Sequence, residues 1–257
     1  ATRCYGAYGG AGDGSTGCFH GLLQLDLIDA RFLLQGPIAK NWSFAVAGRR
    51  SWFDAWLKPV LEEAEASVTS APVYYDYQAI VERKVGRSRL SLRAFGTDDR
   101  FEIIVNDPFV QDPGFGGGLR FSTSFYRLQA LYQDDLSKDV SIESMLSWGK
   151  DELDFSVGTF VFELQQNPIY ARHEFGVRMA DGIKANVGLD FLIAPFDVTV
   201  RPPEPPRPGE PDPGPFTARP IRETEVEDTA FRPGWYGELE LQPAARLRVV
   251  PGARIDY

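Results

Sequence analysis

Hydrophobic and polar residues alternate along most of the chain after residue 18. Every odd position from Ile183 to Ile193 is apolar, whereas Lys184, Asn186 and Asp190 lie between them. This period of two is typical of a β-strand with one apolar and one polar face. The segment before it, 169 to 179, has the same pattern, and the residues 180 to 182, Ala-Asp-Gly, indicate a tight turn. The two segments therefore predict an antiparallel hairpin.

The same alternation recurs along the chain and predicts an all-β, antiparallel fold with about eleven strands. Their approximate ranges are 18–28, 30–37, 42–52, 73–84, 88–98, 118–132, 138–149, 168–179, 183–194, 231–242 and 246–257. Most of these ranges hold about ten or more residues, whereas strands of soluble proteins usually hold about five or six. Strands of this length are long enough to cross a bilayer obliquely.

The connections between the predicted strands alternate in length. Short links at 37–41, 84–87, 134–138, 180–182 and 243–245 alternate with long stretches at 53–72, 99–117, 150–167 and 195–230. Outer-membrane barrels show this asymmetry, with short periplasmic turns and long extracellular loops. The link from Ile28 to Ala30 is an exception, because it is a short turn on the side of the long loops.

Alternation alone does not separate a membrane barrel from a soluble β-sandwich, in which one face of each sheet is also buried. Strand length, one-sided loops and polar faces with charges of both signs favour the barrel. Aromatic residues at segment ends fit interfacial girdles: Trp42, Trp52, Tyr74, Tyr75, Trp148, Trp235 and Tyr257. The alternative that stays open is a soluble or cell-surface β-sandwich that binds carbohydrate or protein.

Charge and composition narrow the choice of partner and compartment. The 257 residues carry a formal net charge of -9, which argues against a broad surface for nucleic-acid phosphates. No stretch approaches the ~20 apolar residues of a membrane-spanning helix. No basic stretch followed by an apolar one stands before the strands, so we expect no targeting segment in this sequence. We expect the chain to be a processed or excised piece of a longer protein.

Several blocks resemble the barrel of TonB-dependent outer-membrane receptors. Those that resemble its first part are FHG at 19–21, QGPI at 35–38, WSFAVAGRRSWFDAWL at 42–57, YYDYQ at 74–78 and RLSLRAFGTDDRFEII at 89–104. One further block resembles a later hairpin of the same barrel; it is RPGWYGELELQPAARLRVVPGARIDY at 232–257. The resemblance covers nearly everything after residue 18 and consists of many weak blocks without one diagnostic motif.

The resemblance implies a transmembrane β-barrel of the 22-stranded type in the bacterial cell outer membrane. Proteins of this family import scarce nutrients, such as siderophore, cobalamin or carbohydrate ligands, with energy from the TonB complex, and catalyse no reaction. The chain departs from that plan because a complete plug is missing and only about half of the strands are present. Residues 1–17 are expected to be a Gly-rich link from plug to barrel, and residues 18–257 a partial barrel. The partners implied are outer-membrane lipid, the TonB complex through the missing plug, and an unidentified small molecule.

The candidate functional residues belong to the barrel interior and to one loop. Polar residues expected to face the lumen and hold the plug are Gln24, Asp26, Arg31, Arg49, Glu174 and Lys184. Apolar residues at helical spacing after residue 51 predict a short amphipathic helix folded over the barrel mouth. Its loop aromatics Trp52, Phe53 and Trp56 either contact substrate or, as we favour, pack on the barrel rim. The proline-rich stretch 201–215 is expected to be an exposed part of a loop.

Other motifs give weak signals. Cys4 and Cys18 suit a disulfide in an oxidising compartment, and equally two reduced thiols. The G-x-G-x-x-G match at 12–17 lacks the strand before it and the helix after it that a nucleotide site needs. His20 and His173 are far apart in the sequence, and His173 interrupts an apolar face, which indicates a bulge or a ring-edge position. Acidic pairs such as Asp98-Asp99 lack the spacing of a Ca²⁺ loop, so we expect no cofactor and no metal.

Overall fold

The computed structural model describes residues 19–63, 68–70, 72–105, 118–204, 209 and 220–257. They form one 14-stranded antiparallel sheet and one helix. The strands are β1 (His20–Leu25), β2 (Asp29–Ala39), β3 (Trp42–Ser51), β4 (Val68–Ser70), β5 (Val73–Val85), β6 (Ser88–Val105), β7 (Leu119–Asp135), β8 (Val140–Val157), β9 (Phe160–Gln166), β10 (Ile169–Ala180), β11 (Ile183–Arg201), β12 (Thr224–Ala244), β13 (Leu247–Val249) and β14 (Gly252–Asp256). The helix α1 (Phe53–Glu63) lies between β3 and β4. None of the helical segments described is long and apolar enough to cross a membrane.

The strands follow one another across the sheet in nearly sequential order. The path β1-β2-β3-β5-β6-β7-β8-β10-β11-β12-β13 contains eleven strands, as the alternation predicts. The remaining three are pieces of broken strands, because β4 and β5 both pair with β6, β9 and β10 both pair with β8 and β11, and β13 and β14 both pair with β12. Pro72, Pro168 and Pro251 stand at the three breaks. Proline has no backbone N–H to donate to a neighbouring strand, which explains why pairing is interrupted there.

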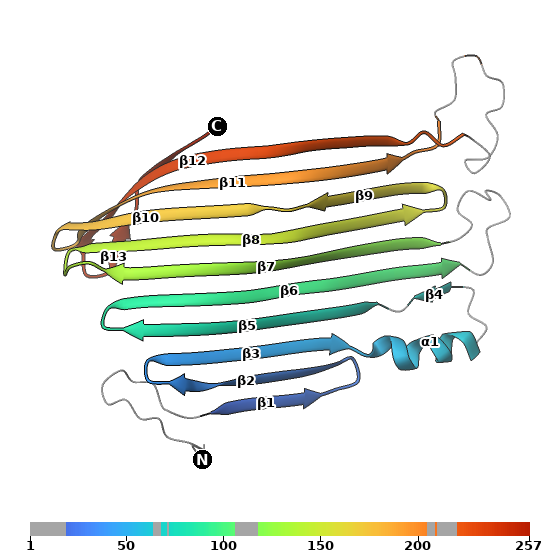
Figure 1. Cartoon of the computed structure of the whole chain (residues 1–257), viewed down its shortest axis with the longest axis horizontal. Coiled ribbons are helices and arrows are strands. Elements are labelled where there is room, and N and C mark those ends of the chain that lie inside the picture. The colour runs from blue at the N-terminus through green and yellow to red at the C-terminus, as the bar shows by residue number, and fades with distance from the viewer. Residues whose placement is uncertain (1–18, 64–67, 71, 106–117, 205–208, 210–219) are drawn as a thin grey trace.

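The two ends of the sheet carry connections of different length (Figure 1). The turns β2–β3, β5–β6, β7–β8, β10–β11 and β12–β13 all lie at one end, on the left of Figure 1. The helix α1 and the carboxyl ends of β6 and β11 lie at the other end. The short-turn end and the long-connection end therefore fall on opposite sides, as the sequence predicts.

The strands are longer than the sequence predicts at the long-connection end. The predicted loop 150–167 is wrong in extent, because β8 continues to Val157 and β9 pairs with it. The predicted loops at 99–117 and 195–230 are likewise shortened, since β6 ends at Val105, β11 ends at Arg201 and β12 begins at Thr224. The alternation in these extensions has the opposite phase: Leu146 and Trp148 are apolar at even positions of β8, and Leu153 at an odd one. A search for one unbroken alternation of apolar and polar residues therefore misses the extension of such a strand.

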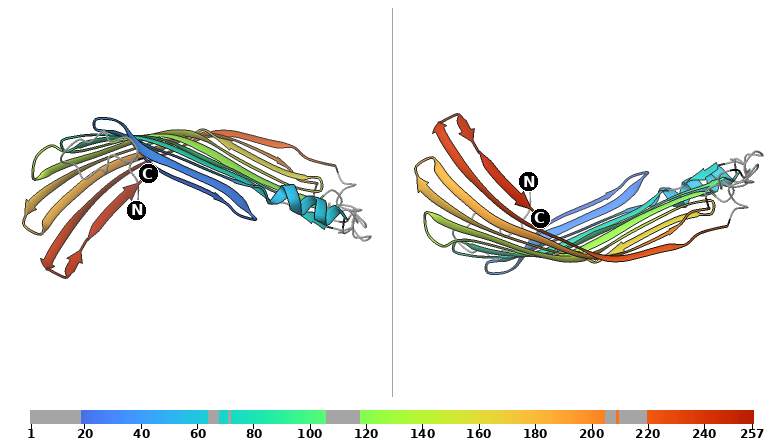
Figure 2. Two further views of the ribbon diagram at one scale, coloured as in Figure 1. Left: turned by 90° about the horizontal axis from the view of Figure 1, so that it is seen from below. Right: turned by 90° about the horizontal axis from the view of Figure 1, so that it is seen from above.

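The sheet is twisted and curved and has no second layer among the described residues (Figure 2). Within that part of the chain, Ala194 is the one hydrophobic residue that is buried. A β-sandwich would bury one face of each sheet against the other. The sandwich alternative therefore does not describe this fold.

Because successive side chains point to opposite sides of a strand, the register divides the residues into two faces. Arg172 lies directly opposite Met145 on one neighbour and Asp190 on the other, so these three share a face. We call it the Arg172 face, and the opposite one the Val187 face, where Val187 lies opposite Phe175 and Gly237.

Candidate functional site

The Val187 face carries exposed apolar side chains in a continuous band next to the short turns. Val187 is 55% exposed, and Leu146 on β8 is 54% exposed. The other large apolar residues exposed there include Leu34, Leu92, Leu128, Phe175, Leu189, Phe231 and Trp235. A water-facing surface of this size is rare on a soluble protein. The band matches the lipid-facing surface of an outer-membrane barrel strand.

Most of the aromatic residues expected in the girdles do lie on this face. Trp42, Tyr75, Trp148 and Trp235 all belong to it by register. Tyr74 does not, and its assignment to a girdle is wrong. It lies on the Arg172 face, where its hydroxyl donates a hydrogen bond to the buried Asp29 carboxylate at 3.0 Å. Tyr74 and Tyr75 are consecutive residues of a strand, so their rings lie on opposite faces of the sheet.

The Arg172 face carries the predicted wall residues. Gln24, Arg31, Arg49, Glu174 and Lys184 all lie on it by register. Asp26 lies in the turn between β1 and β2 and forms an ion pair with Arg31 at 3.4 Å. The structure thus places the predicted residues on one side of the sheet, in two groups that are far apart along the strand order.

The first group is an ion-pair network across β2, β3 and β5. Asp29 on β2 accepts hydrogen bonds from Arg31 and from Tyr74 on β5. On β3, Arg49 Nη2 lies 2.6 Å from Asp76 Oδ2. The guanidinium carbon of Arg49 lies 4.7 Å from the centre of the Tyr74 ring, over which it stacks. Asp29 and Asp76 contribute to the site but have no distinctive sequence signal, because their partners Tyr74 and Arg49 lie on other strands.

The second group links β10, β11, β12 and β14. The Tyr236 hydroxyl donates to Glu174 Oε2 at 2.5 Å and accepts from Arg172 Nε at 2.9 Å. Asp190, which is buried, accepts hydrogen bonds from both terminal nitrogens of Arg254 at 2.7 and 2.8 Å. Two-pronged contacts of this kind fix direction as well as distance. They link β14 to β11 across β12, on the Arg172 face.

We expect Arg254→Gln to release β14, because glutamine cannot reproduce the two-pronged contact with Asp190. Hydrogen exchange of the full-length protein should show faster exchange for the amides of Gly252–Asp256. Arg232→Gln is the control, since Arg232 lies on the same face of β12 and forms no ion pair with any described residue. Equal exchange in the two variants would contradict this role of Arg254.

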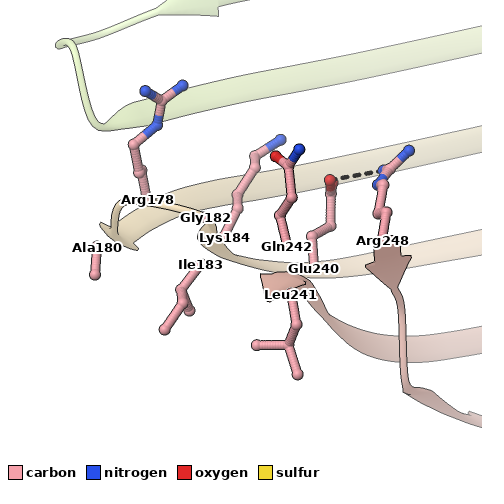
Figure 3. A pocket seen from close by; sticks show the side chains of 9 residues that line it. All are labelled: Arg178, Ala180, Gly182, Ile183, Lys184, Glu240, Leu241, Gln242 and Arg248. Atoms are coloured by element: carbon pink, nitrogen blue, oxygen red, sulfur yellow. Dashed lines mark hydrogen bonds and ion pairs between the residues drawn. The ribbon is translucent and has the colours of Figure 1, made fainter. Parts of the chain in front are cut away.

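The short-turn end of the Arg172 face is rich in long polar side chains. Figure 3 shows Arg178, Lys184, Glu240, Gln242 and Arg248 projecting to one side of the strands, and Ile183 and Leu241 projecting to the other. Arg248 donates to Glu240 at 2.6 Å, and Asn186 donates to Glu240 and Glu238. This rim, formed by the β10–β11 and β12–β13 hairpins, is hydrophilic on one face and apolar on the other.

A hollow of about 600 Å³ lies on the Arg172 face over β2, β3, β5 and β6. Its charged lining includes Arg31, Arg49, Asp76 and Asp99, and its apolar lining includes Phe95 and Phe125. The two rings pack edge to face at 6.3 Å. The hollow can hold water or a segment with mixed polar and apolar side chains.

The loop aromatics hold α1 against the first hairpin. The Trp52 and Trp56 indole nitrogens donate to the backbone carbonyls of Asp26 and Leu27 at 2.8 and 2.9 Å. Phe53 packs edge to face on Trp56 at 5.0 Å. The predicted helix is confirmed, and these contacts support packing on the rim of the sheet rather than contact with substrate.

Asp26 also stabilises the β1–β2 turn, whose backbone carbonyls accept the hydrogen bonds from Trp52 and Trp56. Its carboxylate accepts hydrogen bonds from the backbone N–H groups of Ile28 and Asp29, both at 2.9 Å. The hydrogen bond from Asp29 is the largest cause that lowers the pKa of Asp26. A lowered pKa means that this contribution to stability is present near neutral pH and is lost as the pH falls through the folded-state pKa.

We therefore expect acidification below about pH 4 to loosen the β1–β2 turn. Fluorescence of Trp52 and Trp56 in the full-length protein should shift to longer wavelength as their contacts with the turn weaken. In Asp26→Asn the shift with pH should be smaller. An identical pH profile for this variant and the wild type would exclude Asp26 as the titrating group.

The remaining motifs offer no reaction centre in the described part of the chain. Cys4, Cys18 and the glycine-rich match at 12–17 lie outside the described residues. Of the two alternatives given for His173, the bulge is wrong, because its strand pairs without interruption on both sides there. Ser144 Oγ lies 2.7 Å from the His173 Nδ1. The described His, Asp and Glu residues form no group of three or more placed to hold a metal ion.

The sequence matches no family model and no curated protein. Solved structures do match. The outer membrane transporter YddB from Escherichia coli is 8% identical over 89% of this chain, with a TM-score of 0.56. A mutant of the ferric enterobactin receptor PfeA from Pseudomonas aeruginosa is 13% identical over 93% of this chain, with a TM-score of 0.52.

The chain spans 34% of the YddB chain and 38% of the PfeA chain. At such low identity the likeness concerns the fold alone. YddB is named as an outer membrane transporter, and PfeA is named as a ferric enterobactin receptor. The chain has the all-β, antiparallel fold of part of an outer-membrane β-barrel.

Proposed function

We propose that the chain is part of the transmembrane barrel of a TonB-dependent receptor in the bacterial outer membrane. The observation that carries this proposal is the exposed apolar band of the Val187 face, on long strands whose long connections leave from one end. Hydrocarbon tails cover such a band without a second protein layer. The resemblance of the sequence blocks to this family points the same way.

In this proposal the Val187 face contacts lipid and the Arg172 face lines the lumen. The short turns face the periplasm, and α1 and the long connections lie outside the cell. Residues 18–257 belong to a larger barrel of the 22-stranded type, and residues 1–17 link it to a plug. The charges of the Arg172 face hydrate the interior and contact the plug.

The cargo is a scarce nutrient of the siderophore, cobalamin or carbohydrate type. The family resemblance implies a partnership with the TonB complex, and we assign no residue of this chain to that contact. PfeA is named as a ferric enterobactin receptor, and this name supports the siderophore class among the three. The protein works by binding and passage, without a chemical step and without nucleic acid.

Membrane fractionation of the full-length protein tests the location. We expect it to sediment with outer-membrane markers and to need detergent for extraction. Recovery of the protein in the soluble fraction without detergent would overturn the proposal. A cell that lacks the protein should lose uptake of its nutrient, and a cell that lacks TonB should lose it equally.

A further inference from the structure

The Val187 face is not smooth, because a second hollow of about 600 Å³ lies on it over β2, β3, β5 and β6. We call it the outer hollow. Its lining on this face includes Ala30, Phe32, Arg50, Tyr77, Ala79 and Ala94. Sites that hold a small molecule have volumes of about 300 to 1,000 Å³, so the outer hollow is large enough for a ligand.

The outer hollow exists because small side chains stand beside large ones. Ala79 on β5 and Ala94 on β6 lie directly opposite each other. The rings of Phe32 and Tyr77, which are 47% and 49% exposed, line the same hollow. A recess of this kind surrounds a hydrocarbon chain on several sides, whereas a flat surface contacts it on one side only. The apolar part of the outer hollow therefore fits a flexible chain.

Arg50 stands at the end of the outer hollow that is nearer the long connections. It is the last residue but one of β3, and its guanidinium carbon lies 5.2 Å from the centre of the Tyr75 ring. Arg50 forms no ion pair with any described residue. The ring contact holds the guanidinium beside the hollow and leaves its charge for a ligand.

The other charges near this end are already paired. On the same face, Asp98 forms an ion pair with Arg100 at 2.7 Å. The side chains of Arg31 and Arg49 belong to the Arg172 face, where they take part in the ion-pair network across β2, β3 and β5. The charge of Arg50 is therefore in excess at this end of the hollow and attracts an anionic group.

Neighbouring aromatic residues give the depth of Arg50 in the proposed orientation. Tyr75 lies directly opposite Arg50, and Trp52 follows Arg50 by two residues. Tryptophan and tyrosine are enriched where the membrane meets water. Arg50 thus stands at the level of the head groups of the outer leaflet. From there the outer hollow extends along the strands toward the short turns, past Ala79 and Ala94, among the acyl chains.

We propose that the outer hollow binds an acyl chain of a phosphate-bearing lipid of the outer leaflet, with the phosphate on Arg50. This inference rests on the proposed function, which places the Val187 face in lipid with the long connections outside the cell. The planar guanidinium matches the geometry of a phosphate. A basic group next to an apolar recess is also how other membrane proteins select anionic lipids. A lipid presents its phosphate and its chain in the same order across the membrane as Arg50 and the recess.

Two lipids that differ in the phosphate alone test the role of Arg50. Dipalmitoyl phosphatidic acid and dipalmitoylglycerol have the same two acyl chains. Native mass spectrometry of the full-length protein, purified in detergent, counts the lipid molecules bound at each concentration. We expect the wild type to bind the first molecule of phosphatidic acid more tightly than dipalmitoylglycerol. Arg50→Gln should weaken binding of phosphatidic acid about tenfold and leave binding of dipalmitoylglycerol unchanged.

Arg83→Gln is the matched control for the charge. Arg83 lies on the same face and stacks over the Trp42 ring at 5.5 Å, but near the short turns and away from the outer hollow. This variant should bind both lipids as the wild type does. Equal affinity of the wild type for the two lipids, or unchanged binding of phosphatidic acid in Arg50→Gln, would overturn the phosphate contact.

A second pair of variants tests the recess. Ala79→Leu combined with Ala94→Leu fills the outer hollow while its surface stays apolar, and it should weaken binding of both lipids. Ala130→Leu combined with Ala171→Leu is the control, because these alanines share the Val187 face and lie opposite Leu146 on its two sides. The control should bind both lipids as the wild type does.

Lipid binding that the Ala79→Leu and Ala94→Leu variant leaves unchanged would overturn the inference. A dimer of the wild type that this variant dissociates would overturn it as well, because a second copy of the chain would then occupy the hollow. Each of these results leaves the proposed function standing if the protein still fractionates with the outer membrane. Loss of outer-membrane fractionation, in contrast, would count against the proposed function itself.

Discussion

Val187→Arg is expected to lower the free energy of unfolding of the full-length barrel by about 2 to 4 kcal/mol, the cost of a cation at the middle of a bilayer. Val187 lies near the centre of the apolar run from Ile183 to Ile193, and Phe175 and Gly237 flank it. Neither neighbour can pair with a guanidinium. Denaturant unfolding of the protein in lipid vesicles measures the loss.

Thr199→Arg is the matched control on the same face of the same strand. Thr199 lies beyond the apolar band, directly between Glu163 and Glu225. The new arginine can pair with either carboxylate there, and the cost of a cation falls to about 0 to 1 kcal/mol near the interface. Equal losses for Val187→Arg and Thr199→Arg would contradict the assignment of the Val187 face to lipid.

Gly188→Ala is expected to destabilise the protein by about 1 to 3 kcal/mol, the range for overpacking. A Cβ at Gly188 would meet the Tyr236 ring within 2.3 Å. The ring covers this glycine and cannot withdraw without losing its hydrogen bonds to Glu174 and Arg172. The clash therefore disturbs the whole polar network of β10, β11 and β12. Denaturant unfolding again gives the magnitude.

Gly237→Ala tests whether the effect belongs to this contact. Gly237 lies on β12 next to Tyr236, and the nearest atom to its added Cβ is at 3.8 Å, an ordinary contact. We expect little change in stability. The double variant Gly188→Ala with Tyr236→Ala should lose less than the sum of the two single changes, since removal of the ring relieves the clash. Strict additivity would show that the ring is not the cause.

Much of the sheet follows from local pattern. The alternation around Val187 predicts its hairpin with the correct turn, and the wall residues such as Glu174 and Lys184 fall on one face because side chains alternate. The helix after residue 51 is also evident from its spacing. Each of these features depends on residues that are close together in the sequence.

The sequence pattern fails where its phase changes. Leu146 and Phe155 are both apolar and lie on the same strand, but on opposite faces. A one-phase pattern therefore ends β8 near residue 149, and the extension is assigned to a loop. The bulge, one of the two alternatives given for His173, does not form, because Ser144 on the neighbouring strand accommodates the polar ring.

The amino-acid sequence by itself determined the strand class, the approximate number of strands and the division into apolar and polar faces, since period two is a local property of a chain. Only the tertiary structure decided which side chains meet. Asp190 and Arg254 are 64 residues apart and pair at 2.7 Å. Four strands place Phe101, Phe121, Phe155 and Phe162 in one row, each directly opposite the next. Register sets such contacts, and register arises from hydrogen bonds between distant segments, which the composition of any one segment does not specify.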